Sequence, residues 1–273
     1  MNDLTSRDTH FEFGQNWRDY ATTIDGARIE SAIQGLKKLF PDGLAGKTFL
    51  DIGCGSGLHS LAALSLGASS VLATDIDENS VSTTSQILSQ HFQNSDRWTA
   101  KVISVFDMTP ETLGQFDVVY SWGVLHHTGA MWRAIEMAAK LVKPDGQFAI
   151  AIYGRTPMDA AWKIEKRIYS GAPKALQWII RQAYVGAVFT AQGLRGRNPV
   201  SDAKVRGMNF SHDVHDWLGG YPYETASVDE LRDRICALGF SAKRSFPVAI
   251  SLGGLFSSGC HEVVFQRDAA SSG

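Results

Sequence analysis

The chain has 273 residues, 44% hydrophobic and 20% charged, which is enough apolar material for a large core and too little charge for a disordered chain. Its 26 Lys and Arg against 28 Asp and Glu give a net charge of −2, which disfavours a nucleic-acid partner for the whole chain. The three cysteines, Cys54, Cys236 and Cys260, have no CxxC spacing, and the polar start is not a secretory signal. We therefore expect a cytoplasmic protein with neither a disulfide framework nor a zinc site.

No stretch predicts a membrane span. The best candidate, residues 172–191, is interrupted by Lys174, Gln177, Arg181 and Gln182, which makes it too polar for a hydrocarbon core.

Apolar runs and helical patterns alternate through the first 153 residues. The helical patterns are Ile24–Phe40, Leu58–Gly67, a polar helix from Glu78, and Ala130–Leu141. The predicted strands are Thr48–Asp51, Val71–Asp75, Trp98–Phe106, Phe116–Ser121 and Gln147–Tyr153, with a turn at Lys143–Gly146 before the last. This alternation predicts an α/β fold with a parallel sheet and helices on both faces.

The alternation breaks after residue 153. Two helices are predicted at Met158–Tyr169 and Ala172–Ala191, followed by a polar loop and the segment Asn209–Tyr223. A helix at Val228–Leu238 and strands at Ala242–Phe246 and Glu262–Gln266 complete the chain. We therefore divide it into residues 1–153 (an N-terminal lid segment and the cofactor-binding half), 154–225 (a helical insertion over the substrate) and 226–273 (the end of the same domain).

The insertion carries its own charge. Residues 154–223 hold ten Lys or Arg, among them Arg195, Arg197 and Arg206, and five Asp or Glu. A basic cap of this kind favours an anionic substrate or contact with an anionic surface, although an ordinary solvated helix face has the same composition.

A glycine-rich turn, Asp51–Gly57, stands between the first predicted strand and the helix after it. Glycines allow positive φ and a close approach of ligand to backbone, and a helix start offers unpaired N–H groups. The spacing is GxGxG, whereas a dinucleotide fingerprint needs a third glycine where this chain has Leu58. Asp51 at the mouth of the turn would repel a pyrophosphate and attract an ammonium group.

The second predicted strand ends in Asp75, about 20 residues beyond the turn, where an acidic side chain accepts hydrogen bonds from ribose hydroxyls. Ile76 beside it is suited to packing on an adenine face. The pattern predicts a ligand with an amino acid at one end and a nucleoside at the other.

Four runs carry a family resemblance: FLDIGCGSG at 49–57, VLATDID at 71–77, FDVVYSWGVLHHTGAMWRAI at 116–135 and LVKPDGQF at 141–148. Together they resemble the class I S-adenosylmethionine-dependent methyltransferases, in particular the small-molecule branch with the ubiquinone-biosynthesis-type O-methyltransferases. The resemblance covers about residues 48–153. It implies a Rossmann-like, seven-stranded, mostly parallel sheet with an antiparallel last strand, and S-adenosylmethionine as the cofactor.

The resemblance also implies roles for individual residues. The turn residues Asp51, Gly53, Cys54, Gly55 and Gly57 would line the methionine end of the cofactor. Asp75 would hold the ribose, and Ile76 would contact the adenine. Val105 and Phe106, within Ser104–Asp107, occupy the place of further adenine contacts, although the family's usual Gly-Asp-Ala pattern is absent there. Ser121 and Trp122 occupy the place of contacts to the sulfonium end.

Histidines are the candidates for proton transfer, which is needed when the acceptor carries a proton of high pKa. His126 and His127 follow the fourth predicted strand, at the sheet edge where ligands bind in open α/β folds. We expect one of the two to face the acceptor, and a histidine in this place can instead cap a helix or bond the backbone.

His212 and His215 form a second cluster with Asp213 and Asp216. On a helix they share faces that could orient a substrate, and we expect no metal there. The aromatic segment Trp217–Tyr223 is suited to closing over a flat substrate or to packing the insertion on the sheet. By the resemblance, Trp17 or Tyr20 would contact the sulfonium from the N-terminal segment, which could equally be a packed helix.

These observations predict a methyltransferase that acts by in-line displacement on a small-molecule acceptor, at an oxygen or nitrogen. A base-methylating enzyme usually has an Asn/Asp-Pro-Pro-aromatic motif where this chain has Ser121–Val124, and a nicotinamide enzyme is disfavoured by the loop spacing. A peptide or protein acceptor and a non-catalytic cofactor-binding subunit stay open, and the sequence indicates no oligomeric state.

Overall fold

The computed structural model describes residues 24–93, 96–194, 196 and 210–269. One sheet of seven strands has the order β3-β2-β1-β4-β5-β7-β6. The strands are β1 (Thr48–Ile52), β2 (Ser70–Asp75), β3 (Trp98–Val102), β4 (Phe116–Trp122), β5 (Val142–Tyr153), β6 (Phe240–Phe246) and β7 (Cys260–Arg267). The first five pair in parallel, and β7 pairs antiparallel with both β5 and β6. The predicted fold class is therefore confirmed.

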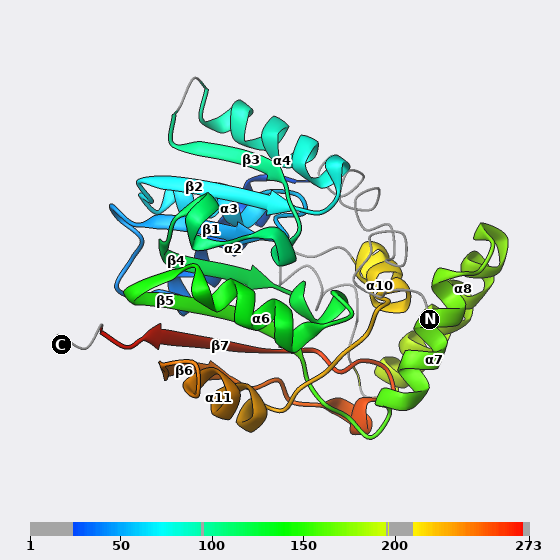
Figure 1. The fold of residues 1–273 in the computed structure, drawn as a ribbon. Coiled ribbons are helices and arrows are strands. Elements are labelled where there is room, and N and C mark those ends of the chain that lie inside the picture. The colour runs from blue at the N-terminus through cyan, green and yellow to red at the C-terminus, as the bar shows by residue number, and fades with distance from the viewer. Residues whose placement is uncertain (1–23, 94–95, 195, 197–209, 270–273) are drawn as a thin grey trace.

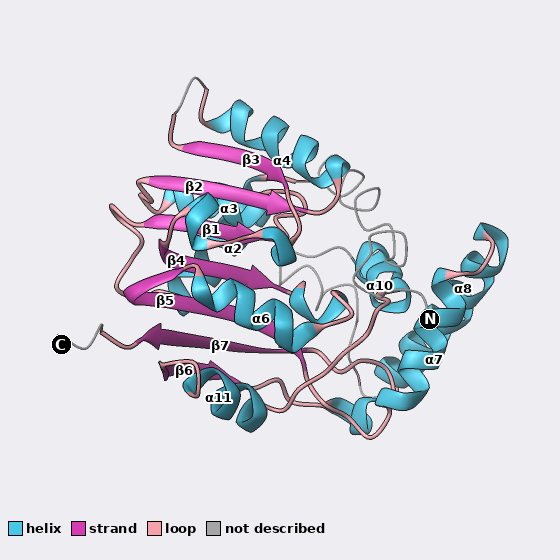
Figure 2. Cartoon of the chain, in the orientation of Figure 1, coloured by secondary structure: helices cyan, strands magenta, loops and turns pink. Residues whose placement is uncertain are grey.

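Helices cover both faces of the sheet (Figures 1 and 2). One core lies under α6 (Met131–Lys140) and α11 (Val228–Cys236), with Ala134, Ile135, Leu231 and Ile235 packed on the sheet. The other lies under α2 (Gly26–Leu39), α3 (Leu58–Ser65) and α4 (Glu78–His91). A short α5 (Pro110–Leu113) precedes β4. The central strands β1 and β4, near-continuously apolar in sequence, thus bury both of their faces.

Two predicted strand boundaries were wrong. Strand β3 ends at Val102 instead of Phe106, because Ser104 caps a 3₁₀ turn at Val105–Asp107 through its hydroxyl. The predicted turn at Lys143–Gly146 lies inside β5, which begins at Val142. It is a bulge there: Val142 pairs with Phe116 and Gln147 with Val118, and Asp145 between them has φ +59°.

The chain after β5 forms α7 (Asp159–Ser170), α8 (Lys174–Gly193) and α10 (Phe210–Gly219). They lie beyond the carboxyl ends of the parallel strands (Figure 1). Buried aromatic residues of α7 and α10, Trp162, Tyr169 and Trp217, hold this layer together, with partly buried Ile180 and Tyr184 of α8 against them. Strand β1 pairs with β2 on one side and β4 on the other, so the order reverses at β1, the place where open α/β sheets bind ligands.

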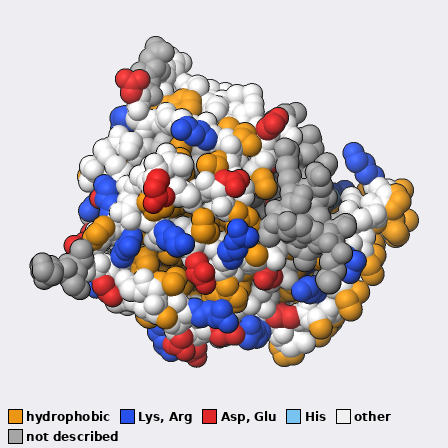
Figure 3. Space-filling view, viewed as in Figure 1, with side chains coloured by type: hydrophobic (Ala, Val, Ile, Leu, Met, Phe, Trp, Pro, Cys, Tyr) orange, Lys and Arg blue, Asp and Glu red, His pale blue; other side chains and the backbone are white. Residues whose placement is uncertain are grey.

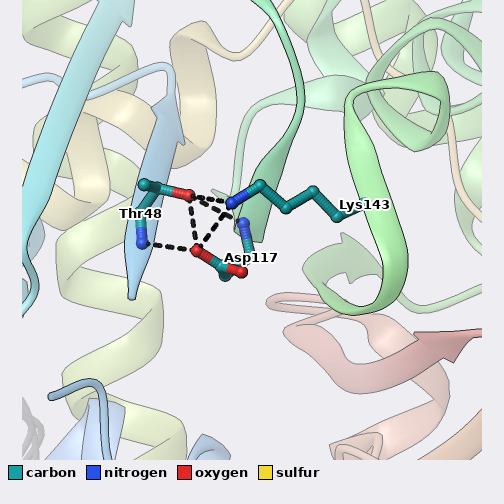
Figure 4. A network of polar contacts seen from close by, with 3 residues as sticks. All are labelled: Thr48, Asp117 and Lys143. Atoms are coloured by element: carbon teal, nitrogen blue, oxygen red, sulfur yellow. Dashed lines mark hydrogen bonds and ion pairs between the residues drawn. The ribbon is translucent and has the colours of Figure 1, made fainter. Parts of the chain in front are cut away.

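A polar network closes the opposite edge of the sheet, where β1, β4 and β5 begin (Figure 4). The Asp117 carboxylate accepts from the Thr48 N–H at 2.9 Å, the Thr48 hydroxyl at 2.7 Å and the Lys143 ammonium at 3.0 Å. Burial alone would raise the pKa of Asp117, but the hydrogen bonds from Thr48 and Lys143 outweigh it and lower the pKa to about 2. The charged form therefore stabilises the junction of three strands.

We expect Asp117→Asn to lower the free energy of unfolding at neutral pH by about 1–2 kcal/mol, the cost of weakening charge-assisted hydrogen bonds at a partly exposed site. Since the folded pKa lies below the ordinary value of 3.8, this contribution is complete above about pH 4 and is lost as the pH falls towards 2. Urea unfolding between pH 7 and pH 2 measures it. The difference from wild type should shrink with acid, and the exposed Asp42→Asn should show none; a constant difference across pH would contradict the assignment.

Candidate functional site

The glycine turn of the sequence is a tight loop between β1 and α3. Gly53, Gly55 and Gly57 have φ of 77°, 53° and 79°, the left-handed region that glycine enters freely. The amides of Gly53 and Cys54 both donate to the Thr74 carbonyl, at 2.8 and 2.9 Å, which ties the loop to β2. Gly57 is the N-terminal cap of α3 and supplies no side-chain cap, so N–H groups of the first helical turn stay available to a ligand.

At two of these positions a side chain is excluded by neighbouring atoms as well as by the positive φ. A Cβ on Gly53 would lie 2.3–2.9 Å from the side chain of Val124, and one on Gly57 would lie 2.9 Å from Thr84. The loop is therefore packed between the segment after β4 and α4. Cys54 turns its side chain into this packing, where Thr84 donates to its Sγ at 3.2 Å and burial raises the thiol pKa.

Asp75 lies at the end of β2 against the loop. Its Oδ2 accepts from the Gly55 N–H at 3.1 Å and its Oδ1 from the Asp77 N–H at 2.9 Å, and burial raises its pKa to about 6. Each oxygen keeps a lone pair for a further donor. Ile76, the next residue, is half-buried.

Asp51 is placed differently from the expectation of a carboxylate open at the mouth of the loop. It is the fourth residue of β1, almost fully buried, and its Oδ2 accepts from the Ser60 hydroxyl of α3 at 2.6 Å. Burial raises its pKa to about 7. A nearby cation would favour its charged form, so the predicted attraction for an ammonium group stays a prediction.

The residues expected at the adenine and sulfonium ends have partners within the chain. Val105 is buried, and Phe106 is half-buried with the Arg133 guanidinium 4.9 Å above its ring. Ser121 is fully buried and donates to the Ile52 carbonyl at 3.0 Å. Trp122 donates to Glu262 of β7 at 3.0 Å. The side chains of Ser121 and Trp122 thus bond within the sheet, and a direct ligand contact by either stays a prediction.

The two histidines after β4 have separate environments. His127 is held by a hydrogen bond of 2.8 Å between its Nδ1 and the Pro222 carbonyl, so it joins the β4 end to the segment after α10. His126 is fully buried, its ring centroid is 4.0 Å from that of Tyr153, and neither of its ring nitrogens has a hydrogen-bond partner. Burial, with the nearby His127 and Lys166, lowers its pKa well below the ordinary range. His126 is therefore neutral, and both of its ring nitrogens are buried without a hydrogen-bond partner.

Comparisons with known proteins agree with this geometry. Residues 50–148 match the family model described as a methyltransferase domain. The chain is 36% identical over 115 residues to a ubiquinone biosynthesis O-methyltransferase of Pseudomonas paraeruginosa, covering 42% of this chain and 48% of that protein. It is 32% identical over 134 residues to a tRNA U34 carboxymethyltransferase of Methylococcus capsulatus, covering 48% of this chain and 37% of that one. Residues 50–148 thus match a methyltransferase domain, and the seven-stranded sheet is the one that the resemblance to class I methyltransferases implies.

Solved structures share the fold over a larger part of the chain. The magnesium protoporphyrin IX methyltransferase of Synechocystis, solved with S-adenosylhomocysteine, superposes with a TM-score of 0.59, 16% identity, and coverage of 96% of this chain and 98% of that one. A 1,6-didemethyltoxoflavin N1-methyltransferase of Burkholderia thailandensis superposes with a TM-score of 0.51 and 17% identity. The match covers 89% of this chain and 80% of that one. The chain spans about half the length of the curated relatives that it matches.

Aromatic side chains that follow the matched residues in the chain form a cluster, and one of them, Tyr153, contacts His126. We name Tyr153, Trp162, Trp217 and Tyr223 the aromatic cluster; Trp217 lies 5.3 Å from Tyr153 and 5.0 Å from Trp162, between ring centroids. Lys166 is fully buried in it, donates to the Trp217 carbonyl and lies 3.7 Å from the Trp217 ring centroid. Burial lowers the pKa of Lys166.

Sequence reasoning found Trp217 and Tyr223 of this cluster and missed the other members. Tyr153 is the last residue of β5, and its ring centroid lies 5.6 Å from that of Tyr223. Because ligands bind at the carboxyl ends of parallel strands, its position at a strand end was a signal in the sequence. Lys166 was counted only as part of a basic surface. The helical spacing of Trp162 and Lys166, four residues apart on α7, is the signal that places them on one inward face.

The second histidine cluster lies partly outside the described side chains. His215 bonds to the Tyr169 hydroxyl at 2.8 Å, which joins α10 to α7. The side chain of His212 is not described, so a catalytic role for it stays a prediction. Trp17, Tyr20, Arg195, Arg197 and Arg206 also lie outside the described residues. Within the part of the chain that the structure describes, no group of three or more His, Cys, Asp or Glu could hold a metal ion.

We expect Gly53→Ala to lower the free energy of unfolding by about 2–4 kcal/mol, the sum of the left-handed φ of an alanine and overpacking against Val124. Gly46→Ala is the control, because Gly46 has φ +72° with nothing within 4 Å of the added Cβ and should cost only the backbone part. Adding Val124→Ala should recover part of the loss in the Gly53→Ala variant. Equal losses in Gly53→Ala and Gly46→Ala would show that the contact with Val124 has no cost.

Proposed function

We propose that this protein transfers the methyl group of S-adenosylmethionine to an oxygen or nitrogen of a small-molecule acceptor. The observation that carries the proposal is the glycine loop bonded through Gly55 to the carboxylate of Asp75, at the carboxyl edge of the sheet, where the buried His126 follows β4. The methyltransferase domain, the relatives that share it and the fold of the neighbouring structures support the proposal.

The residues present fit this cofactor. Asp75 has lone pairs for ribose hydroxyls on both carboxylate oxygens. Gly53, Gly55 and Gly57 would let the methionine end approach the backbone, with the Asp51 carboxyl two residues before the loop's first glycine. Ile76, Val105 and Phe106 supply apolar surface for the adenine. When bound, the cofactor supplies a methyl group made electrophilic by its sulfonium.

The chain's own part in the reaction is to orient the acceptor, exclude water and remove a proton. His126 is neutral at physiological pH because burial lowers its pKa, and its two ring nitrogens are unpartnered. It can accept a proton from an acceptor hydroxyl or amine at the start of methyl transfer. The bond from its Nδ1–H to the Pro222 carbonyl fixes the His127 ring between the β4 end and the segment after α10, so we assign this histidine to positioning.

The aromatic cluster supports a flat acceptor. Rings at 5–6 Å spacing offer faces and edges for stacking, and the Lys166 ammonium offers attraction to an anionic group on the acceptor. In this proposal residues 154–225 form the cap over the acceptor, and the methyl transfer takes place in the cytoplasm. The described part of the chain holds all three cysteines and none of them forms a disulfide, which is compatible with that compartment.

The cofactor assignment is tested by calorimetric titration with S-adenosylmethionine, S-adenosylhomocysteine and NAD. We expect micromolar-range binding of the first two and none of NAD. Asp75→Ala should weaken that binding by about 10–100-fold, because it removes charge-assisted hydrogen bonds to the ribose. The control is Asp96→Ala, an exposed acid just before β3 at the opposite edge. Unchanged affinity in Asp75→Ala, or binding of NAD alone, would refute the assignment.

The acceptor is sought by measuring S-adenosylhomocysteine release with phenols, catechols, aromatic acids and aromatic amines. With an active acceptor, we expect His126→Asn to lower kcat by about 100-fold or more while the Kd for the cofactor stays unchanged. His91→Asn, on the exposed end of α4, is the control. Full turnover in His126→Asn would contradict its role as base. Intact cofactor binding with no release for any acceptor class would instead favour a macromolecular acceptor or a non-catalytic subunit.

A further inference from the structure

Helices α7 and α8, joined by the short turn at residues 171–173, carry an apolar patch on their outer side. Five large side chains near this turn are 43–63% exposed; they are Ile164, Ile168, Leu176, Trp178 and Ile179. Figure 3 shows hydrophobic side chains gathered along the edge of the molecule that α7 and α8 form in Figure 1. We name these five residues the hairpin patch. Single exposed apolar residues are common on protein surfaces, whereas a cluster of them marks an interaction surface.

The charges around the hairpin patch are of one sign. Lys163, Arg167 and Lys174 are exposed beside it, and Arg181 is half-buried one turn further along α8. Helix α8 contains no Asp or Glu in its 20 residues.

The two acids of α7 are turned away from this surface. Asp159 is engaged by the Thr156 and Thr225 hydroxyls, at 2.8 and 2.5 Å. Both carboxylate oxygens of Glu165 are buried. The outward face therefore presents apolar side chains in a rim of cations, with no exposed carboxylate on either helix.

We propose that the hairpin patch docks on the surface of an anionic lipid bilayer. A helix that has aromatic and aliphatic side chains on one face and Lys or Arg beside them lies in the plane of a membrane interface, apolar side chains inserted and cations against acidic headgroups. Trp178 is the side-chain type that anchors at this depth. None of the helices in the described part of the chain is long and apolar enough to cross a bilayer, so the contact is peripheral.

A second copy of this chain is the less suitable occupant. A two-fold contact would bring the patch against itself, and with it the cations of one hairpin against those of the other. Since the acids of α7 are engaged or buried and α8 has none, no carboxylate of the hairpin would neutralise that contact. Acidic headgroups supply the missing charge.

The inner side of the same helices links this surface to the aromatic cluster. Trp162 and Lys166 of α7 point inward to Trp217, while Ile164 and Ile168 point outward. The docking surface thus lies on the outside of the layer that covers His126. The inference depends on the exposed side chains and their charges, and it stands or falls without the assignment of methyl transfer.

The test is co-sedimentation of the full chain with vesicles of phosphatidylcholine alone and with a quarter of phosphatidylglycerol. We expect the protein to bind the anionic vesicles at least about tenfold more strongly than the neutral ones, and the preference to fall with added salt. Replacing Lys163, Arg167 and Lys174 together by Gln should weaken the binding by about a hundredfold, at about fivefold for each cation. Trp178→Ser with Ile179→Ser should weaken it by about tenfold or more.

Matched variants separate this surface from general stickiness. Lys47, Lys101 and Lys243 are exposed elsewhere, and their joint replacement by Gln removes the same charge. Val102→Ser with Leu238→Ser removes apolar side chains that are 50% and 41% exposed. Both control variants should bind as wild type does, and thermal melting should show all variants folded, because every replaced side chain is exposed.

Three outcomes would overturn the proposal. The wild type could bind neither vesicle, or the hairpin variants could bind as well as the controls. Alternatively, gel filtration with light scattering could show a concentration-dependent dimer that Trp178→Ser with Ile179→Ser abolishes, which would assign the patch to a second copy. None of these readouts uses methyl transfer, so the failure of one proposal is distinguishable from the failure of the other.

Discussion

The geometry of the candidate site depends on two hydrogen bonds, which two neighbouring backbone amides donate to one carbonyl. The bonds from Gly53 and Cys54 to Thr74 hold the loop after β1 against the end of β2. They can form only because the chain turns through positive φ at Gly53, where Val124 leaves no room for a Cβ. Once this junction is made, the Gly55 N–H reaches Asp75, and the carboxylate is oriented before any ligand arrives. Preorganisation of this kind spares a ligand the cost of ordering its own site.

The fold and the loop could be predicted from the sequence because both depend on local signals. Apolar runs with turn residues between them located the strands, and glycine spacing with an acid at the next strand end located the loop. The errors fell where local and tertiary signals conflict. Lys143–Gly146 has the composition of a turn, but the pairing of Val142 with Phe116 makes it a bulge within β5. The run to Phe106 is apolar enough for a strand, but Ser104 diverts it into a 3₁₀ turn.

Side-chain roles were less predictable than positions, because burial and bonding depend on elements distant in sequence. Nothing local separates His126 from His127; the difference comes from the Pro222 carbonyl, 95 residues further along the chain, which bonds the second and not the first. The environment of Trp122 likewise depends on a residue distant in sequence, because its hydrogen-bond partner Glu262 is on β7. The sequence shows that residue 166 is a lysine. It does not show that this lysine is buried among aromatic rings of α7, α10 and the segment after α10.

Helix α7 presents unusual side chains on both of its sides, a buried lysine on the inner side and exposed isoleucines on the outer side. Its inner side must hold a lysine out of water, which is tolerable only where a carbonyl and aromatic faces replace the lost hydration, as the Trp217 carbonyl and ring do. Its outer side carries Ile164 and Ile168 in solvent, which gives no folding advantage to the isolated chain. A contact that covered the outer side would recover that apolar area, and it would do so on the same helix that places Lys166 in the aromatic cluster.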